Sequence, residues 1–216
     1  MKTKENYLKA MYMIVQEGKS ISLSLLSEKM GVSIPTANSM VKRLDDMGLV
    51  KYRKYKPLEL TPKGKKAAGR ILRKHRIAEM YLVEQLGFSW EEVHDIAEEI
   101  EHIPSEKLFD KMDEALGFPE TDPHGSPIPD KNGNMSSTCY AKLADMESGQ
   151  TVRLCAIHKS DAPLLKFLNQ KELKLGTIIK ILHIEPFDKS MTVSYDDFSE
   201  VVLSNDVCVR LLVEVC

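Results

Sequence analysis

Apolar residues in the first part of the chain recur at the three- and four-residue spacing of amphipathic helices. This spacing predicts three helices, over residues 3–17, from Ser22 to Met30, and from Ser33 to Gly48. The first helix carries Asn6 and Lys9 on its polar side. Ser22 and Ser33 stand at N-cap positions, and Gly31 ends the middle helix. Two helices separated by such a short turn are typical of a helix-turn-helix.

Two short stretches after the third helix favour strands. Residues 49–53 and 58–61 flank residues 54–57, which predicts a basic hairpin, or wing, beside the helix-turn-helix. Further helices are predicted from Thr61-Pro62 to about Leu86, from Ser89 onwards with Glu92 in a capping box, and from Ser105 to Gly117. Their apolar stripes need a partner surface, so we expect dimerisation here.

The last third of the chain has the alternation of short strands. Residues 117–138 are rich in proline and glycine and predict a loop or linker. Strands are expected over residues 151–157, 177–185, 190–195, 200–204 and 207–215, with a short helix over residues 162–169. This pattern predicts a small antiparallel barrel. The expected fold class is therefore mainly α with a small β part.

Charge divides the chain into three segments, although the net charge is only −2. Residues 1–74 hold 17 Lys and Arg against 6 Asp and Glu, whereas residues 75–138 hold 4 against 15. In residues 139–216 the numbers of basic and acidic residues are nearly equal. A basic first segment indicates a polyanionic partner, and an acidic middle segment suits cations. We take these segments as the predicted domains.

The third helix and the wing carry the candidate DNA contacts. These are Ser33, Pro35, Thr36, Asn38, Ser39, Lys42 and Arg43 on the helix, and Lys54 on the wing. Short polar groups such as Thr36 and Asn38 can reach base edges, while Lys42 and Arg43 suit phosphates. The alternative is that this basic surface serves only solubility.

The stretch from His94 to His102 has the pattern of a metal site. His94, Glu98, Glu101 and His102 are spaced to share one face of a helix, and His75 and Glu79 repeat the four-residue spacing on the preceding helix. Imidazole and carboxylate without thiolate suit a divalent ion such as Mn²⁺, Fe²⁺, Co²⁺ or Zn²⁺. The alternative is a solvated polar face.

The four cysteines, Cys139, Cys155, Cys208 and Cys216, show no C-x-x-C spacing. We interpret them as free or buried thiols in a reducing compartment. No run of apolar residues approaches a membrane span or a signal peptide, so we expect a cytoplasmic protein without a membrane partner.

With these patterns assembled, the chain resembles the diphtheria-toxin-repressor family of metal-dependent transcription regulators over essentially its full length. The resemblance rests on R-K-H-R at 73–76 with Glu79, on H-D-x-A-x-x-x-E-H from His94 to His102, on S-x-P-T at 33–36, on M-G-L-V at 47–50 and on the linker at 117–129. The linker is similar to that of the three-domain, manganese-responsive members.

This resemblance implies a winged helix over residues 1–74, a helical dimerisation and metal-binding domain over residues 75–138, and an SH3-like (FeoA-like) barrel over residues 139–216. It implies an activating metal site of Asn6, Glu98, Glu101 and His102. An ancillary site would use His75, Glu79, His94, Asp122, His124 and Asp161. Asp122 and His124 are equally compatible with ordinary turn residues.

Two positions bear on the metal. By resemblance, position 6 is Met in iron-type members and Asp in manganese-type members, whereas this chain has Asn6, a neutral oxygen donor. Glu98 matches the manganese type, where the iron type has Cys. Oxygen at both positions favours Mn²⁺, with Fe²⁺ as the alternative. Lys9 stands where some manganese regulators supply a second carboxylate, which argues against a binuclear site of that kind.

The predicted function is a metal-dependent repressor, and not an enzyme, that binds operator DNA as a homodimer and controls metal-homeostasis genes in response to Mn²⁺ or Fe²⁺. In this hypothesis the clustered carboxylates repel one another without metal, so that the domains move independently. One alternative is a winged-helix regulator that responds to an organic ligand. Another is a metalloenzyme, which the absence of an H-E-x-x-H motif disfavours.

Overall fold

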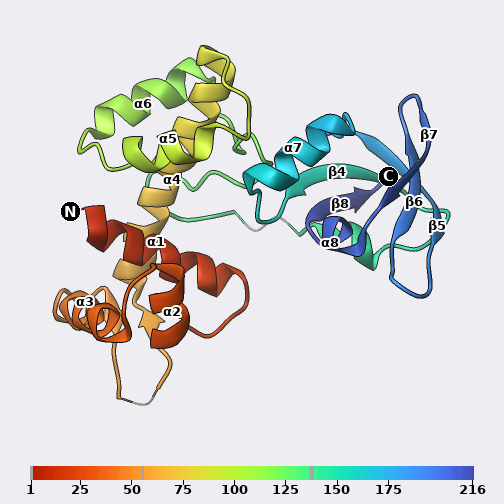
Figure 1. Ribbon diagram of the computed structural model, residues 1–216. Coiled ribbons are helices and arrows are strands. Elements are labelled where there is room, and N and C mark those ends of the chain that lie inside the picture. Colours follow the sequence, from red (N-terminus) through yellow and green to blue (C-terminus); the bar gives the residue numbers. More distant parts are fainter. Residues whose placement is uncertain (1, 55, 137–138) are drawn as a thin grey trace. The chain divides into compact units, whose positions relative to one another are not determined.

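The computed structural model describes residues 2–54, 56–136 and 139–216. The chain forms two compact units, which we treat separately (Figure 1). The first unit comprises Met1–Tyr81, Asp95–Pro119 and Ile128–Ser136, and the second unit comprises Leu82–His94, Glu120–Pro127 and Ser137–Cys216. Within the part of the chain that is described, no helix is long and apolar enough to cross a membrane.

Six helices and a two-stranded hairpin occupy the first half of the chain. They are α1 (Lys2–Gln16), α2 (Leu23–Lys29), α3 (Ile34–Asp46), β1 (Val50–Lys51), β2 (Glu59–Leu60), α4 (Pro62–Leu86), α5 (Val93–Ile100) and α6 (Glu106–Ala115). The predicted N-caps are confirmed for α2 and α3, because the hydroxyls of Ser22 and Ser33 accept from Leu25 N and Thr36 N. Thr61 caps α4 in the same way, accepting from Gly64 N.

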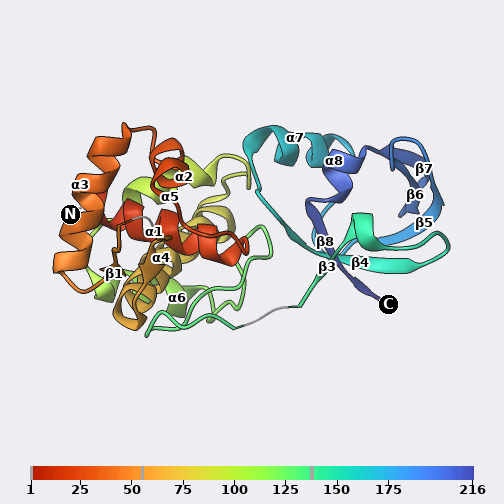
Figure 2. The same cartoon turned by 90° about the horizontal axis from the view of Figure 1, so that it is seen from below.

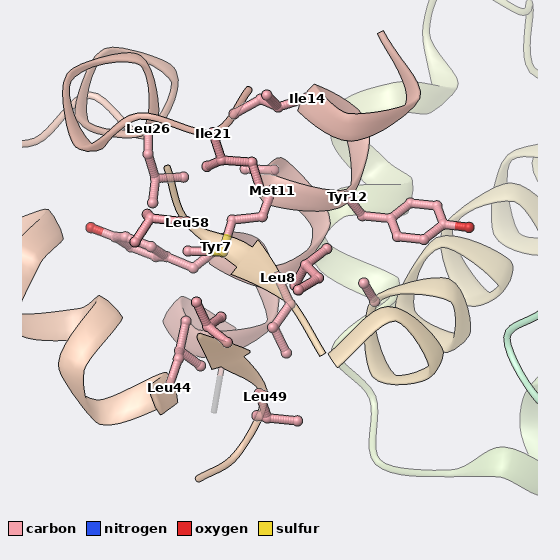
Figure 3. Packing of buried hydrophobic residues seen from close by; sticks show 14 of the residues in the cluster. Tyr7, Leu8, Met11, Tyr12, Ile14, Ile21, Leu26, Leu44, Leu49 and Leu58 are labelled. Carbon is pink, nitrogen blue, oxygen red and sulfur yellow. The ribbon is translucent and has the colours of Figure 1, made fainter. Parts of the chain in front are cut away.

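The core of the winged helix forms around one face of α1. Tyr7, Met11 and Ile14 are fully buried against Leu26 of α2 and Leu44 of α3 (Figure 3). This packing follows the predicted helical spacing. Because the three helices share one core, the position of α3 depends on the position of α1.

The predicted wing is confirmed. β1 and β2 pair antiparallel with Val50 opposite Leu60, and Ile21 adds an isolated bridge to Leu58. Lys54 is exposed between the strands, and Tyr55, at the predicted turn, lies outside the described residues. The winged helix-turn-helix is therefore present in the first unit.

The predicted helix over His94 to His102 ends earlier than expected. α5 begins at Val93, four residues after Ser89, although Ser89 N and Oγ both donate to Glu92 as in a capping box. The helix ends at Ile100, so that Glu101 and His102 lie in a turn. Pro104 follows shortly afterwards, and a proline disfavours helical geometry in the residue before it. This preference accounts for the early end of α5.

The segment Ile128–Ser136 packs on α4 and is not a loose linker. A Cβ on Gly69 would lie 2.1 Å from the carbonyl oxygen of Gly133, so the backbones approach too closely for any side chain. Asp130 closes the turn by accepting from Asn132 N and Asn134 N. Ile128 is buried beside Ile77 of α4.

An antiparallel sheet of six strands forms the second unit, in the order β3-β8-β4-β5-β6-β7, and its strands curve into a small barrel (Figure 2). The elements are β3 (Ala141–Lys142), a 3-10 turn (Leu143–Asp145), β4 (Thr151–Ile157), α7 (Ala162–Gln170), β5 (Ile178–Ile184), β6 (Met191–Tyr195), β7 (Phe198–Leu203), α8 (Asn205–Cys208) and β8 (Leu211–Val215). The predicted barrel is confirmed, and a cluster of buried hydrophobic residues forms its core.

One predicted strand was wrong in its first half. Residues 207–215 have the alternation of a strand, but Asn205–Cys208 forms the short helix α8 and the strand begins only at Leu211. Ser204 explains the difference, because its hydroxyl accepts from Val207 N as an N-cap. The cap competes locally with the β propensity of the valines.

Candidate metal centre

Polar side chains from α1, α4 and the end of α5 are buried together in the first unit. Lys9, His75, Glu79 and Glu101 are exposed by only 7%, 5%, 3% and 1%. Buried ionisable groups are rare unless they are paired or bind metal. Lys9, which the helical spacing places on the polar side of α1, is therefore buried among polar groups.

Glu101 is the hub of this cluster. Its Oε2 accepts a 2.8 Å hydrogen bond from Lys9 Nζ and lies 2.7 Å from His75 Nδ1. Its Oε1 lies 3.6 Å from His102 Nε2. Lys9 Nζ also forms an ion pair with Glu98 Oε1. One carboxylate therefore contacts groups from both of the predicted metal sites.

Three buried ligand-type atoms on residues of the predicted activating site have no hydrogen-bond partner. They are Asn6 Oδ1, Glu101 Oε1 and His102 Nε2. A buried polar atom without a partner is costly, and such atoms in a native fold point to a missing ion or water. Amide oxygen, carboxylate oxygen and imidazole nitrogen are ligands for Mn²⁺, Fe²⁺ and Zn²⁺. The residues present therefore fit a divalent metal ion.

Glu5 is a candidate functional residue that the sequence patterns missed. Its Oε2 lies 2.7 Å from His102 Nδ1. A carboxylate at Nδ1 holds the proton there and leaves the lone pair of Nε2 for a metal, which is how partners outside the ligand set fix a ligating histidine. The only signal in the sequence is its place beside Asn6, and nothing in the spacing links it to His102.

His75 is held in its charged form by two carboxylates. Glu79 Oε1 lies 3.0 Å from His75 Nε2, while Glu101 occupies the Nδ1 side. Burial alone would lower the pKa of His75, but the charge of Glu79 and the hydrogen bonds that the ring donates to Glu101 and Glu79 outweigh this effect and raise the pKa to about 9. One ligand atom from each of His75, Glu98 and Glu101 lies within 4.8 Å of the others.

The other candidate ligands belong to the second unit. His94 is the second residue of α5, and His124 is buried, with Nε2 2.9 Å from the carbonyl oxygen of Trp90 and its ring stacked on that indole. Asp122 Oδ1 accepts from the amides of His124 and Ser126 in a tight turn. Their assignment to an ancillary site stays a prediction.

Asp161 has a structural role in the barrel. Its Oδ1 accepts from Leu164 N as the N-cap of α7, and its Oδ2 forms a 2.7 Å ion pair with Arg210. Partial burial works to raise the pKa of this carboxyl, but the Leu164 amide and the Arg210 guanidinium lower it below the usual value. These contacts account for the residue without a metal, and its role as a ligand stays a prediction.

The candidate DNA contacts gather on one exposed surface of α3. Ser33, Pro35, Thr36, Ser39, Lys42 and Arg43 are exposed, and Asn38 is half-buried. The three hydroxyls among them already have partners, because Ser33 Oγ contacts Thr36 Oγ1 and Ser39 Oγ donates to the Pro35 carbonyl. Lys42 and Arg43 are therefore the better placed of these residues to contact a phosphate backbone.

Three family models match successive parts of the chain. They are described as the N-terminal DNA binding domain of iron dependent repressors (residues 1–58), the metal binding and dimerisation domain of iron dependent repressors (residues 61–130) and the FeoA domain (residues 141–215).

Curated relatives agree with these matches. The iron-dependent repressor IdeR of Mycobacterium leprae is 34% identical over 69% of this chain and 68% of its own length. IdeR of Mycobacterium tuberculosis is 39% identical, but the alignment covers 59% of this chain and 55% of that protein. The diphtheria toxin repressor of Corynebacterium efficiens is 30% identical over 84% and 83% of the two chains.

Solved structures extend the similarity to the whole chain. A manganese-dependent transcriptional repressor in complex with manganese is 32% identical, with a TM-score of 0.90 over 99% of this chain and all of that one. The manganese regulator SloR is 30% identical, with a TM-score of 0.79 over 99% of this chain. The chain belongs to the diphtheria toxin repressor family of metal-dependent transcriptional repressors.

Proposed function

We propose that this chain is a repressor that binds operator DNA when Mn²⁺ or Fe²⁺ is bound, and that it controls genes of metal homeostasis. Asn6, Glu98, Glu101 and His102 are the proposed ligands of the activating ion. The observation that carries this assignment is the set of three buried ligand atoms that make no hydrogen bond, on Asn6, Glu101 and His102. They come from α1 and from the turn after α5, which are far apart in the sequence.

A bound dication would accept the lone pairs of these three atoms and supply a positive charge beside them. The chain's own residues link this centre to the DNA-binding surface. Asn6 sits one residue before Tyr7, which is buried in the core shared by α1, α2 and α3. Fixing Asn6 relative to Glu101 therefore restrains α3 through packed side chains, and operator DNA selects the restrained state.

The proposed DNA surface and domain boundaries follow the sequence prediction. α3 would enter a major groove with Thr36 and Asn38 toward base edges, and Lys42, Arg43 and Lys54 near phosphates. Residues 1–74 would form the DNA-binding domain, residues 75–138 the dimerisation domain and residues 139–216 the barrel. The protein acts as a homodimer on chromosomal DNA, hence in the cytoplasm, and has no catalytic activity.

The ligand set favours Mn²⁺ over softer ions, because two carboxylates, an amide oxygen and an imidazole are mainly hard donors. Fe²⁺ is the second candidate, since the curated relatives include iron-dependent repressors and the solved structures include manganese-dependent ones. Asn6 supplies no negative charge, so the affinity is expected to be lower than with a carboxylate at that position.

The decisive experiment is an anaerobic mobility-shift series on the promoter region of the gene for this protein. Binding is measured with Mn²⁺, with Fe²⁺, with Zn²⁺ and with a chelator. We expect a shifted complex with Mn²⁺ or Fe²⁺ and loss of the complex with chelator. Equal operator binding in chelator and in metal would overturn the proposal and favour a regulator that responds to an organic ligand.

A further inference from the structure

Lys9 occupies an unusual place for a lysine on an amphipathic helix. The residue is buried in the first unit, and its Nζ donates to Glu101 Oε2 at 2.8 Å and forms an ion pair with Glu98 Oε1. Lysine is almost never fully buried unless it is paired. The two carboxylates therefore account for the position of the ammonium group.

The surroundings of this ammonium have the composition and spacing of a metal site. His75, Glu98 and Glu101 each offer a ligand atom within 4.8 Å of the others. Lys9 Nζ contacts two of these three residues. A metal ion placed among them would need the carboxylate oxygens that the ammonium now uses.

We propose that the Lys9 ammonium fills a second cation site formed by His75, Glu98 and Glu101, and thereby limits this cluster to one metal ion. The proposal rests on the proposed function, because that single ion is the one assigned to Asn6, Glu101 and His102. Glu101 serves both cations through different oxygens: Oε2 contacts Lys9, and Oε1 has no hydrogen-bond partner.

The ammonium also changes the expected behaviour of the metal-free protein. Two carboxylates buried without a counter-charge would repel each other and lose solvation, which is strongly unfavourable. Lys9 supplies a positive charge from α1 to Glu98 on α5, so the ion pair joins these two helices before any metal binds. The hypothesis that repulsion separates the domains without metal is therefore corrected: the carboxylates are already partly neutralised.

The test compares the native chain with Lys9→Met, which removes the charge and keeps most of the apolar stem. Lys9→Gln retains a hydrogen-bond donor and serves as the second variant in case the methionine variant does not fold. Lys19→Met is the matched control, because Lys19 pairs with Glu17 at the surface of the same unit. Mn²⁺ is titrated calorimetrically into each metal-free protein, and thermal unfolding is followed in chelator.

Lys9→Met and Lys9→Gln are expected to bind one more Mn²⁺ per chain than the native protein. Removal of a positive charge that contacts Glu98 and Glu101, two of the proposed ligands, should also tighten the original site by about tenfold or more. In chelator, both variants should unfold roughly 5 °C or more below the native chain, and added Mn²⁺ should remove this difference. Lys19→Met should match the native chain in every measurement.

An unchanged Mn²⁺ count in both Lys9 variants overturns the proposal, even if their metal-free forms are less stable, because Lys9 would then be a structural ion pair only. Failure of the proposed function is seen separately, as a native chain that binds no Mn²⁺ or Fe²⁺. In that event a variant that gains one Mn²⁺ still supports the filled site.

Discussion

At the residue scale, the proposed metal centre also depends on residues outside its ligand set. Glu5 Oε2 lies 2.7 Å from His102 Nδ1, so the unpartnered Nε2 of the same ring is the atom that a metal would use. Lys9 forms ion pairs with the carboxylates of Glu98 and Glu101. The ligand set alone would therefore give an incomplete account of metal affinity.

Glu5→Ala should weaken Mn²⁺ binding by about 10–100-fold, the usual cost of losing a carboxylate that orients a ligating histidine. The reason is that the His102 ring loses both its fixed orientation and its preferred tautomer. Calorimetric titration of Mn²⁺ into the metal-free protein measures the change. Glu28→Ala, which removes an exposed carboxylate on α2 of the same unit, is the control and should leave the affinity unchanged.

Asn6→Asp should raise the affinity for Mn²⁺ by about tenfold, since a carboxylate adds a negative charge where the amide offers only a dipole. Asn6→Ala should lower it, because the oxygen donor is lost. The same titration distinguishes the two variants. If neither substitution changes Mn²⁺ affinity, Asn6 does not belong to the ligand set.

Lys9 also shows where inference from the sequence reached its limit. Its helical position places it on the polar side of α1, and periodicity predicts only that this side avoids the apolar core. The side chains that receive it, Glu98 and Glu101, lie about ninety residues later, so no local pattern indicates a buried polar interior. Motif spacing was enough to identify the candidate ligands, but it could not identify Lys9 as their counter-ion.

At the element scale, local capping made most helix starts predictable. Ser22, Ser33, Thr61 and Ser105 each accept a hydrogen bond from the first turn of the helix that follows. The errors arose where a second local preference competed. Ser204 starts α8 within a strand-like run, and Pro104 ends the helix before Glu101.

Gly69 on α4 provides a test of how firmly Ile128–Ser136 packs on that helix. Alanine is normally the better residue within a helix by about 1 kcal/mol. Here its Cβ would lie 2.1 Å from the Gly133 carbonyl oxygen, so Gly69→Ala should instead destabilise the chain by about 1–3 kcal/mol. Denaturant unfolding measures the sign, and the exposed Lys65→Ala on the same helix should stay within about 0.5 kcal/mol of the native chain. A more stable Gly69→Ala variant would show that the segment moves away at little cost.

At the scale of the whole molecule, the proposed function couples metal and operator through the winged-helix core. Asn6 and the buried Tyr7 are neighbours on α1, and the same core holds Leu44 of α3. Two ligands that favour one arrangement of a protein must strengthen each other equally, because the coupling free energy is a single quantity. The effect of metal on DNA binding therefore has a measurable counterpart.

Operator DNA should raise the affinity for Mn²⁺ by the same factor by which Mn²⁺ raises the affinity for operator, roughly 5–150-fold for a coupling of about 1–3 kcal/mol. Calorimetric Mn²⁺ titrations with and without operator give one factor, and mobility shifts with and without Mn²⁺ give the other. In His102→Ala, Mn²⁺ should no longer raise the affinity for operator, and operator should no longer raise the affinity for Mn²⁺, because a proposed ligand is removed. The variant should keep its oligomeric state in gel filtration, since the wing and α6 are unaltered. Unequal factors in the native chain would mean that Mn²⁺ acts on operator binding through a site other than the one measured. A full metal response in His102→Ala would exclude His102 from the activating centre.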